Sequence, residues 1–245
     1  MTGARSWVIA PRVTGSTVRV LAIVLLALGP LASPVAAQFP SLPFDFRPLH
    51  DPYPTYSVFL DYGLGLADIS QLQMLAGRAT LESEKLRGGI GLGLLIREGA
   101  GADDELAFSG AFAYNVRGPF SLVVADVQLG FSYFESGGGA DPELRQLDIP
   151  FGLAAGISGR LPFEVISNVE PWLALRGQVR RTELSGSGSD VDAWRAGGGL
   201  TAGLGVLLPA GFGARLAVEW LMIRSPTASE WDHEVVLGLA ALWRR

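Results

Sequence analysis

The alternation of apolar residues with small or polar residues is the feature that most constrains the fold of this chain. Over residues 194–208 the even positions are apolar or small, whereas the odd positions carry Arg195, Thr201 and several glycines. Side chains of a strand point alternately to its two faces, whereas those of a helix repeat about every 3.6 residues. A period of two sustained over this whole segment therefore predicts a β-strand.

The same alternation recurs along the rest of the chain and predicts ten strands. Three of the segments are less regular, namely 56–65, 75–84 and 169–181, and their ends are uncertain by a few residues. The other seven predicted strands are 87–97, 105–116, 123–133, 146–158, 194–208, 212–222 and 234–243.

Composition shows that the apolar residues are distributed along the chain and not gathered in helical spans. The mean hydropathy is +0.31, yet after Ala37 no apolar run approaches the roughly 18 residues that a membrane helix needs. Glycine makes up 32 of 245 residues and gathers on the polar faces of the predicted strands, where charged side chains would need space. These features favour a closed barrel that is apolar outside and polar inside.

The composition also excludes several classes of function. The absence of cysteine excludes disulfide scaffolds and cysteine-based metal or thiol chemistry, and only two histidines are present. We therefore predict no metal site and no cofactor. The formal net charge of −5 argues against a nucleic-acid partner, which would require a basic surface.

The first 55 residues differ from the rest of the chain. Arg5, Arg12 and Arg19 precede a short apolar run over residues 20–32, and small residues follow it, which is the pattern of a secretory signal peptide. We predict a signal peptide over residues 1–37, cleaved after Ala37; an uncleaved anchor is the alternative. Residues 38–55 are rich in proline and predict an extended lead-in on the periplasmic side, with a segment that blocks the barrel mouth as the alternative.

Together these patterns resemble bacterial outer-membrane β-barrel proteins as a class, over residues 56–245 and the signal peptide. The resemblance implies an all-β fold, a closed antiparallel up-and-down transmembrane β-barrel of about ten strands in the outer membrane. It implies outer-membrane lipid as a partner, with the barrel-insertion machinery and periplasmic chaperones as partners during assembly. Proteins of this class usually end on or near an aromatic residue, whereas here Trp243 is followed by Arg244 and Arg245.

The connections between the predicted strands alternate in length. Segments 99–104, 135–143, 183–192 and 225–232 are small, polar and acidic, whereas 84–87, 117–119 and 209–211 are short. Barrels of this class have longer extracellular loops and short periplasmic turns, which predicts acidic loops outside and both termini on the periplasmic side. Segment 160–168 is long for a periplasmic turn, and the first outer loop, 67–74, is poorly defined.

The alternation also predicts which charged side chains face the barrel interior. Charges buried in a narrow space must be paired, and arginine suits this because its planar fork binds carboxylates. The sequence favours an internal salt-bridge network over a narrow channel for a small solute, which is the alternative. The predicted interior charges are Asp61, Arg78, Glu82, Glu84, Arg87, Arg97, Glu105, Asp126, Asp148, Arg160, Arg176, Arg180, Arg195, Arg215 and Glu219.

On the outer face, aromatic side chains predict girdles at the membrane interfaces. These are Tyr62, Tyr114, Tyr133, Trp194, Trp220 and Trp243. We also considered a lipid hydrolase built on His233, but alternation places His233 outside and its neighbours Asp232 and Glu234 inside. We therefore predict no catalytic residues and a non-enzymatic barrel, either structural or a narrow porin-like channel, with surface binding through the acidic loops as an alternative.

Overall fold

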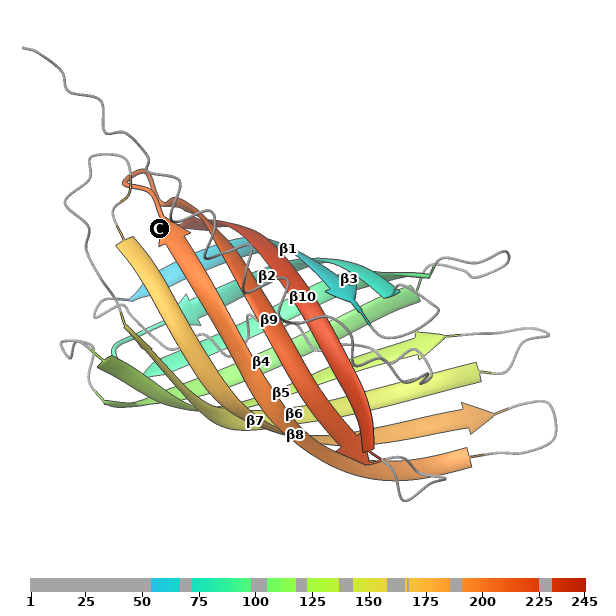
Figure 1. Cartoon of the computed structure of the whole chain (residues 1–245). Helices are drawn as coiled ribbons and strands as arrows, with labels where there is room; N and C mark the ends of the chain where they lie inside the picture. Colours follow the sequence, from blue (N-terminus) through green and yellow to red (C-terminus); the bar gives the residue numbers. More distant parts are fainter. Residues whose placement is uncertain are drawn as a thin grey trace, which may run out of the picture. The chain divides into compact units, whose positions relative to one another are not determined.

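The computed structural model describes residues 54–66, 72–97, 105–117, 123–136, 143–157, 166, 168–185, 191–224 and 231–245. Within these ranges the chain is all-β and forms ten strands (Figure 1). The predicted signal peptide and nearly all of the proline-rich lead-in lie outside the described residues, as do most of the residues of the longer connections.

The ten strands are those that the alternation predicts, with different ends. Their bounds are β1 Thr55–Gly65, β2 Leu72–Glu82, β3 Leu86–Arg97, β4 Glu105–Arg117, β5 Val123–Ser136, β6 Glu143–Ile157, β7 Asn168–Ser185, β8 Val191–Leu207, β9 Phe212–Arg224 and β10 Trp231–Arg244.

The structure corrects several predicted boundaries, most clearly at the start of β2 and in the hairpin of β7 and β8. Strand β2 begins at Leu72, so three residues assigned to the first outer loop belong to a strand. Strand β7 continues past residue 181 to Ser185, and β8 begins at Val191. In this extension the outward side chains are charged, and Arg181 binds Asp192 across the two strands at 2.9 Å. Ion pairs therefore continue the hairpin beyond the point where apolar alternation ends.

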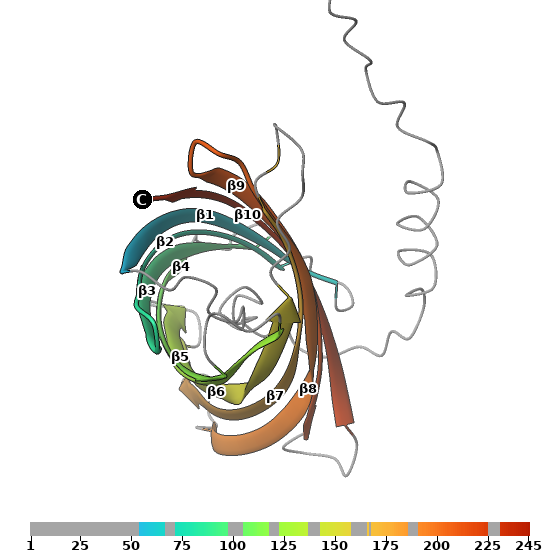
Figure 2. The same ribbon diagram turned by 90° about the vertical axis from the view of Figure 1, so that its left-hand side faces the viewer.

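The strands form a closed barrel in the order β1-β10-β9-β8-β7-β6-β5-β4-β3-β2, and every neighbouring pair is antiparallel. Strand β1 pairs with β10 from Ser57↔Arg244 to Gly65↔Val236, which closes the barrel (Figure 2). The fold class predicted from the sequence, a closed up-and-down barrel, is confirmed.

The two ends of the barrel differ. One end, here called the turn end, carries the tight connections Ser83–Lys85 and Leu208–Gly211 together with Thr55 and Arg245. The short turns predicted near 84–87 and 209–211 lie there. The other end, here called the loop end, carries the connections β1–β2, β3–β4, β5–β6, β7–β8 and β9–β10. Hairpin β7–β8 extends farther at this end than β9, whose register with β8 stops at Gly197↔Ile223.

Apolar side chains of the strands are exposed on the outer face and charged side chains are buried inside, the reverse of the pattern in a soluble protein. On β7 the outward-facing Leu173 and Leu175 are 53% and 61% exposed, whereas the inward-facing Arg176 and Arg180 are 4% and 0% exposed. Among the described residues, two small clusters of apolar side chains are buried inside the barrel. One contains Met74, Ala76, Leu95, Ala107 and Phe134; the other contains Ala154, Trp172, Ala174, Ala217 and Ala240.

Two outward-facing glycines lie under aromatic rings of the neighbouring strand. Phe151 pairs in register with Gly177, and Phe131 pairs with Gly110. A Cβ atom added at either glycine would overlap the ring beside it. The rings thus cover backbone that has no side chain of its own, a recognised way to stabilise glycine in a sheet.

This arrangement predicts that Gly177→Ala destabilises the barrel. The added methyl group must displace the Phe151 ring, and such overpacking costs about 1–3 kcal/mol of unfolding free energy. Urea unfolding of the detergent-solubilised protein, followed by tryptophan fluorescence, measures the change. The matched control is Gly77→Ala, because a Cβ atom at Gly77 meets nothing within 4 Å. Equal effects of the two substitutions would contradict the prediction.

Candidate functional site

The barrel interior is the candidate site, because alternation brings charged side chains from nearly every strand to it. Most of the charges predicted to face inward are buried there, and Arg195 is half-buried. The buried ones are Asp61, Arg78, Glu82, Arg87, Glu105, Asp126, Asp148, Arg176, Arg180, Arg215 and Glu219. Arg160 and the side chain of Arg97 lie outside the described part of the structure.

The inward placement predicted for Glu84 is wrong. Strand β2 ends at Glu82, and Glu84 lies in the turn Ser83–Lys85 with an exposed side chain. The turn is closed by a hydrogen bond from the Ser83 backbone N–H to the Leu86 carbonyl at 2.7 Å. Once the chain turns, the alternation of the strand no longer determines where a side chain points.

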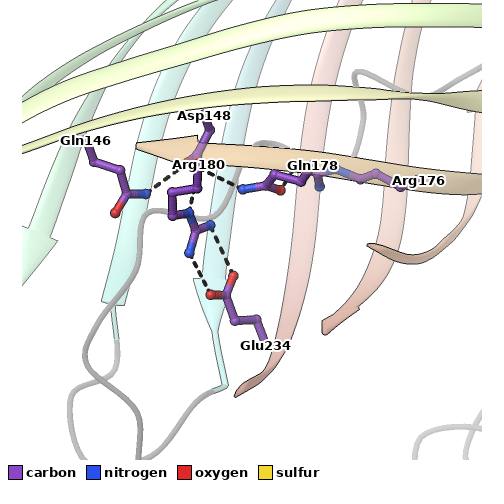
Figure 3. Close-up of polar contacts among 6 residues, drawn as sticks. All are labelled: Gln146, Asp148, Arg176, Gln178, Arg180 and Glu234. Carbon is purple, nitrogen blue, oxygen red and sulfur yellow. Dashed lines mark hydrogen bonds and ion pairs between the residues drawn. The ribbon is translucent and has the colours of Figure 1, made fainter. Parts of the chain in front are cut away.

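Arg180 lies at the centre of the network near the loop end and is fully buried (Figure 3). Its Nε donates to Asp148 Oδ1 at 2.5 Å, while Nη1 and Nη2 donate to the two carboxylate oxygens of Glu234 at 2.7 and 3.3 Å. Asp148 is on the neighbouring strand β6, but Glu234 is on β10, with β8 and β9 between it and β7 in the barrel order. The Arg180–Glu234 pair therefore crosses the interior.

Two glutamines extend this network along the barrel. Gln146 and Gln178 donate to the two oxygens of Asp148 at 2.9 and 2.7 Å (Figure 3). Gln178 in turn accepts a hydrogen bond from Arg176 at 2.7 Å.

Arg176 continues the network toward β9. It forms an ion pair with Glu219, which also accepts a hydrogen bond from the Thr201 hydroxyl at 3.0 Å. Residues of β6, β7, β8, β9 and β10 are thus joined through buried polar contacts.

A second group of charges surrounds the buried ring of Phe59 on β1. Arg78 binds Asp61 through two hydrogen bonds of 2.9 and 3.3 Å, and its guanidinium lies 4.3 Å from the ring centre of Phe59. The guanidinium of Arg215 lies over the same ring at 4.7 Å. The ring therefore holds two cations near one another through cation–π contacts.

Arg244 provides a third set of contacts, at the turn end. Its guanidinium binds Glu82 on β2 at 3.0 Å and approaches Glu170 on β7 at 3.9 Å. Asn168 also donates to Glu170 at 3.0 Å. Because β10 and β7 are not neighbours, the contact between Arg244 and Glu170 crosses the interior as the Arg180–Glu234 pair does.

Four interior charges are absent from the predicted set, namely Glu170, Asp232, Glu234 and Arg244, although the alternation contains a signal for each. Glu170 lies at an inward position of the predicted strand 169–181, and alternation places Asp232 and Glu234 on the inner face beside His233. Extending the last predicted strand by one residue places Arg244 on an inward position as well.

The aromatic side chains predicted at the interfaces lie on the outer face at both ends of the barrel. Trp243 and Tyr114 lie toward the turn end, and Trp243 packs edge-on against Tyr56 at 5.6 Å between ring centres. Tyr62, Tyr133, Trp194 and Trp220 lie toward the loop end. There Tyr133 donates to Glu135 at 2.9 Å, and Tyr62 donates to Gln73 at 3.1 Å.

His233 faces outward, as alternation predicts, and stacks on Trp220 with 5.9 Å between ring centres. Asp232 and Glu234 are buried on the opposite face of β10. The histidine is thus separated from the carboxylates that a catalytic triad would require. Ser225, Ser229 and His50 lie outside the described residues.

Among the described residues, no helix is long and apolar enough to cross a membrane. No group of three or more metal-ligating side chains occurs in that part of the chain.

No protein-family model matches the chain, and no curated protein matches it. Among solved structures it is similar to Neisserial surface protein A (TM-score 0.40, 10% identity, covering 78% of this chain and 95% of that one). It is also similar to the β domain of the Bordetella autotransporter BrkA (0.46, 12%, 79% and 99%) and to Ail, the attachment invasion locus protein of Yersinia pestis (0.39, 13%, 79% and 99%). The fold assignment rests on the strand order and register of this chain.

The network predicts that Arg180→Met strongly destabilises the protein. The substitution leaves two buried carboxylates, Asp148 and Glu234, without their cation, and breaking a buried ion pair costs about 3–5 kcal/mol of unfolding free energy. Chemical unfolding in detergent micelles measures the loss. Arg181→Met is the control, because the adjacent arginine is partly exposed on the outer face and its ion pairs are screened by solvent. A similar loss in both variants would show that the buried network is not what stabilises the interior.

Proposed function

We propose that this chain is a non-enzymatic outer-membrane β-barrel whose outer face contacts lipid and whose interior is closed by ion pairs. The proposal has two parts, the membrane location and the closed interior. They rest on different surfaces of the barrel and can be tested separately.

The membrane location is supported by the outer face. Large apolar side chains are exposed on all ten strands, among them Leu60, Ile90, Leu153 and Leu175, which are 56–71% exposed. An apolar band of this kind is costly in water, whereas lipid accommodates it. Aromatic residues at both ends of the barrel lie where the two interfaces would be. Closure of the sheet pairs the backbone N–H and C=O groups of every strand edge, and lipid offers these groups no hydrogen-bond partners.

The closed interior is supported by the contacts that cross it. The Arg180–Glu234 pair joins β7 to β10 near the loop end, Arg176–Glu219 joins β7 to β9, and Arg244 contacts both β2 and β7 near the turn end. Ten strands enclose a narrow interior, close to the size that side chains fill. The single observation that carries this part is the fully buried guanidinium of Arg180, bound on two sides.

The remaining sequence predictions concern regions that lie outside the described residues. We retain as proposals a signal peptide over residues 1–37, a lead-in over residues 38–55, and contacts with insertion machinery and chaperones during assembly. A surface-binding function would depend on the acidic connections at the loop end. Most of the residues of those connections also lie outside the described ranges.

The first test is the lipid contact of the outer face. Leu175→Arg places a charge midway along β7 on the exposed face, and in the middle of a bilayer this costs about 2–4 kcal/mol. We expect reduced recovery of heat-modifiable folded protein in the outer-membrane fraction. Ser185→Arg, on the same strand and exposed at its loop end, is the control and should behave as wild type. Normal yields of the Leu175 variant would argue against a lipid-facing surface.

The second test is the conductance of the interior. Purified wild-type protein reconstituted in planar bilayers should give no single-channel steps, because ion pairs occupy the path at both ends of the barrel. Insertion is verified on the same preparation by heat-modifiable migration on gels. Reproducible steps from inserted protein would replace the closed barrel with the narrow-channel alternative and leave the membrane location intact.

A further inference from the structure

Two arginines lie side by side on the inner face of the barrel near the loop end. Arg195 on β8 is directly opposite Arg180 on β7 in the register. Like charges directly opposite each other destabilise a pair of antiparallel strands. Arg180 is compensated, since it binds both Asp148 and Glu234 (Figure 3). These contacts do not account for the second cation beside it.

Arg195 has no direct partner. Within the described part of the chain its side chain takes part in no ion pair or hydrogen bond, and its Nε is buried without an acceptor. A buried donor in this state costs free energy. On β10, Asp232 faces inward and is 8% exposed, and within the same ranges its side chain also takes part in no ion pair or hydrogen bond. The loop end of the interior therefore holds a cation and a carboxylate that make no direct contact.

The carboxylates near Arg195 include those that bind Arg180. Besides Arg180, the charged groups that act on Arg195 are Asp232, Glu234 and Asp148. These groups lie on β10 and β6, on either side of the β7–β8 hairpin in the barrel order. The two arginines thus share one set of carboxylates.

The strand order places Arg195 within reach of Glu234. Strand β8 is separated from β10 by β9 alone, whereas β7 is separated from β10 by both β8 and β9. Arg180 spans the larger separation and binds Glu234 at 2.7 Å. Arg195 is in register with Arg180, has the same side chain and starts one strand nearer, so a change of rotamer can bring it to the same carboxylate.

We propose that Arg180 and Arg195 form an ion-pair switch at the loop end, in which either guanidinium group binds Glu234. In the arrangement seen here, Arg180 binds Glu234 and Arg195 lies beside it without a partner. In the second arrangement, Arg180 keeps Asp148 and Arg195 binds Glu234. Both arrangements join the β7–β8 hairpin to β10 across the interior. The exchange involves interior side chains only, so it does not depend on lipid contact of the outer face.

A crystal structure of the detergent-solubilised Arg180→Met variant tests the exchange directly. Removing the Arg180 guanidinium leaves Glu234 without its cation, so the Arg195 guanidinium should move to within hydrogen-bonding distance of the Glu234 carboxylate. Arg180→Lys gives the same readout if the methionine variant does not fold, because lysine lacks the fork that binds two carboxylates. An Arg195 side chain that stays away from Glu234 in the folded variant, whether unpaired or bound to Asp232, would overturn the proposal.

Urea unfolding gives a second test, in which the effect of Arg195→Met changes sign with its background. In the wild type this substitution should leave the folding equilibrium constant unchanged or raise it, because it removes a cation that has no direct partner and lies opposite another. In either Arg180 variant the same substitution should lower the constant about tenfold, a coupling typical of residues in one ion-pair network. Destabilisation of the wild type, or no effect in the Arg180 variants, would refute the switch.

Arg145→Met is the matched control for this experiment. Arg145 is an exposed arginine near the same end of the barrel, but it lies on the outer face of β6 and pairs with Glu135 at 3.4 Å. Ion pairs of this kind contribute little to stability. The substitution should have the same small effect in the wild type and in the Arg180 variants. An effect that changes with background as much as that of Arg195→Met would show a general response to lost charge, and would contradict the switch.

Discussion

Closure of the sheet is the constraint on which the rest of this structure depends. A strand edge that faces an apolar environment leaves backbone donors and acceptors unsatisfied, so β1 must pair with β10 along its length. The pairing reaches the last residue: the backbone N–H groups of Tyr56 and Arg245 each donate to the carbonyl of the other, at 3.1 and 3.0 Å. Closure then turns one face of every strand toward a narrow interior. The inward side chains must therefore fit together there and pair their charges.

The interior accommodates charge through arginine. Arg180 uses three of its donors on two carboxylates that lie on different strands, and Phe59 lies within cation–π distance of both Arg78 and Arg215. Buried ion pairs contribute little net stability compared with apolar packing, but removing one partner is costly. The network therefore favours the observed register of the strands, since a shift by one residue would turn the inward charges of a strand to the outer face.

The strands were predictable from the sequence, whereas the ion pairs inside the barrel were not. Alternation is a local property, so even the irregular segment over residues 56–65 emerged at nearly its observed bounds. It failed at Glu84, where a turn interrupts the strand, and at the end of β7, where ion pairs extend the hairpin past its apolar positions. Which arginine meets which carboxylate depends on barrel order and register. Arg180 and Glu234 are 54 residues apart and meet only because β7 faces β10 across the interior.

The last residues of β10 show how one strand serves both the outer surface and the interior of the barrel. In the sequence, Arg244 and Arg245 follow Trp243, whereas barrels of this class usually end on or near an aromatic residue. In the structure Arg244 is the last residue of β10, and alternation places Trp243 and Arg244 on opposite faces of this strand. Trp243 faces outward and packs on Tyr56, whereas Arg244 faces inward and binds Glu82. Its backbone N–H donates to the carbonyl of Gly211, whose positive φ of 83° shapes the turn between β8 and β9. The final strand thus keeps its aromatic residue at the outer surface and contributes one further charge to the interior.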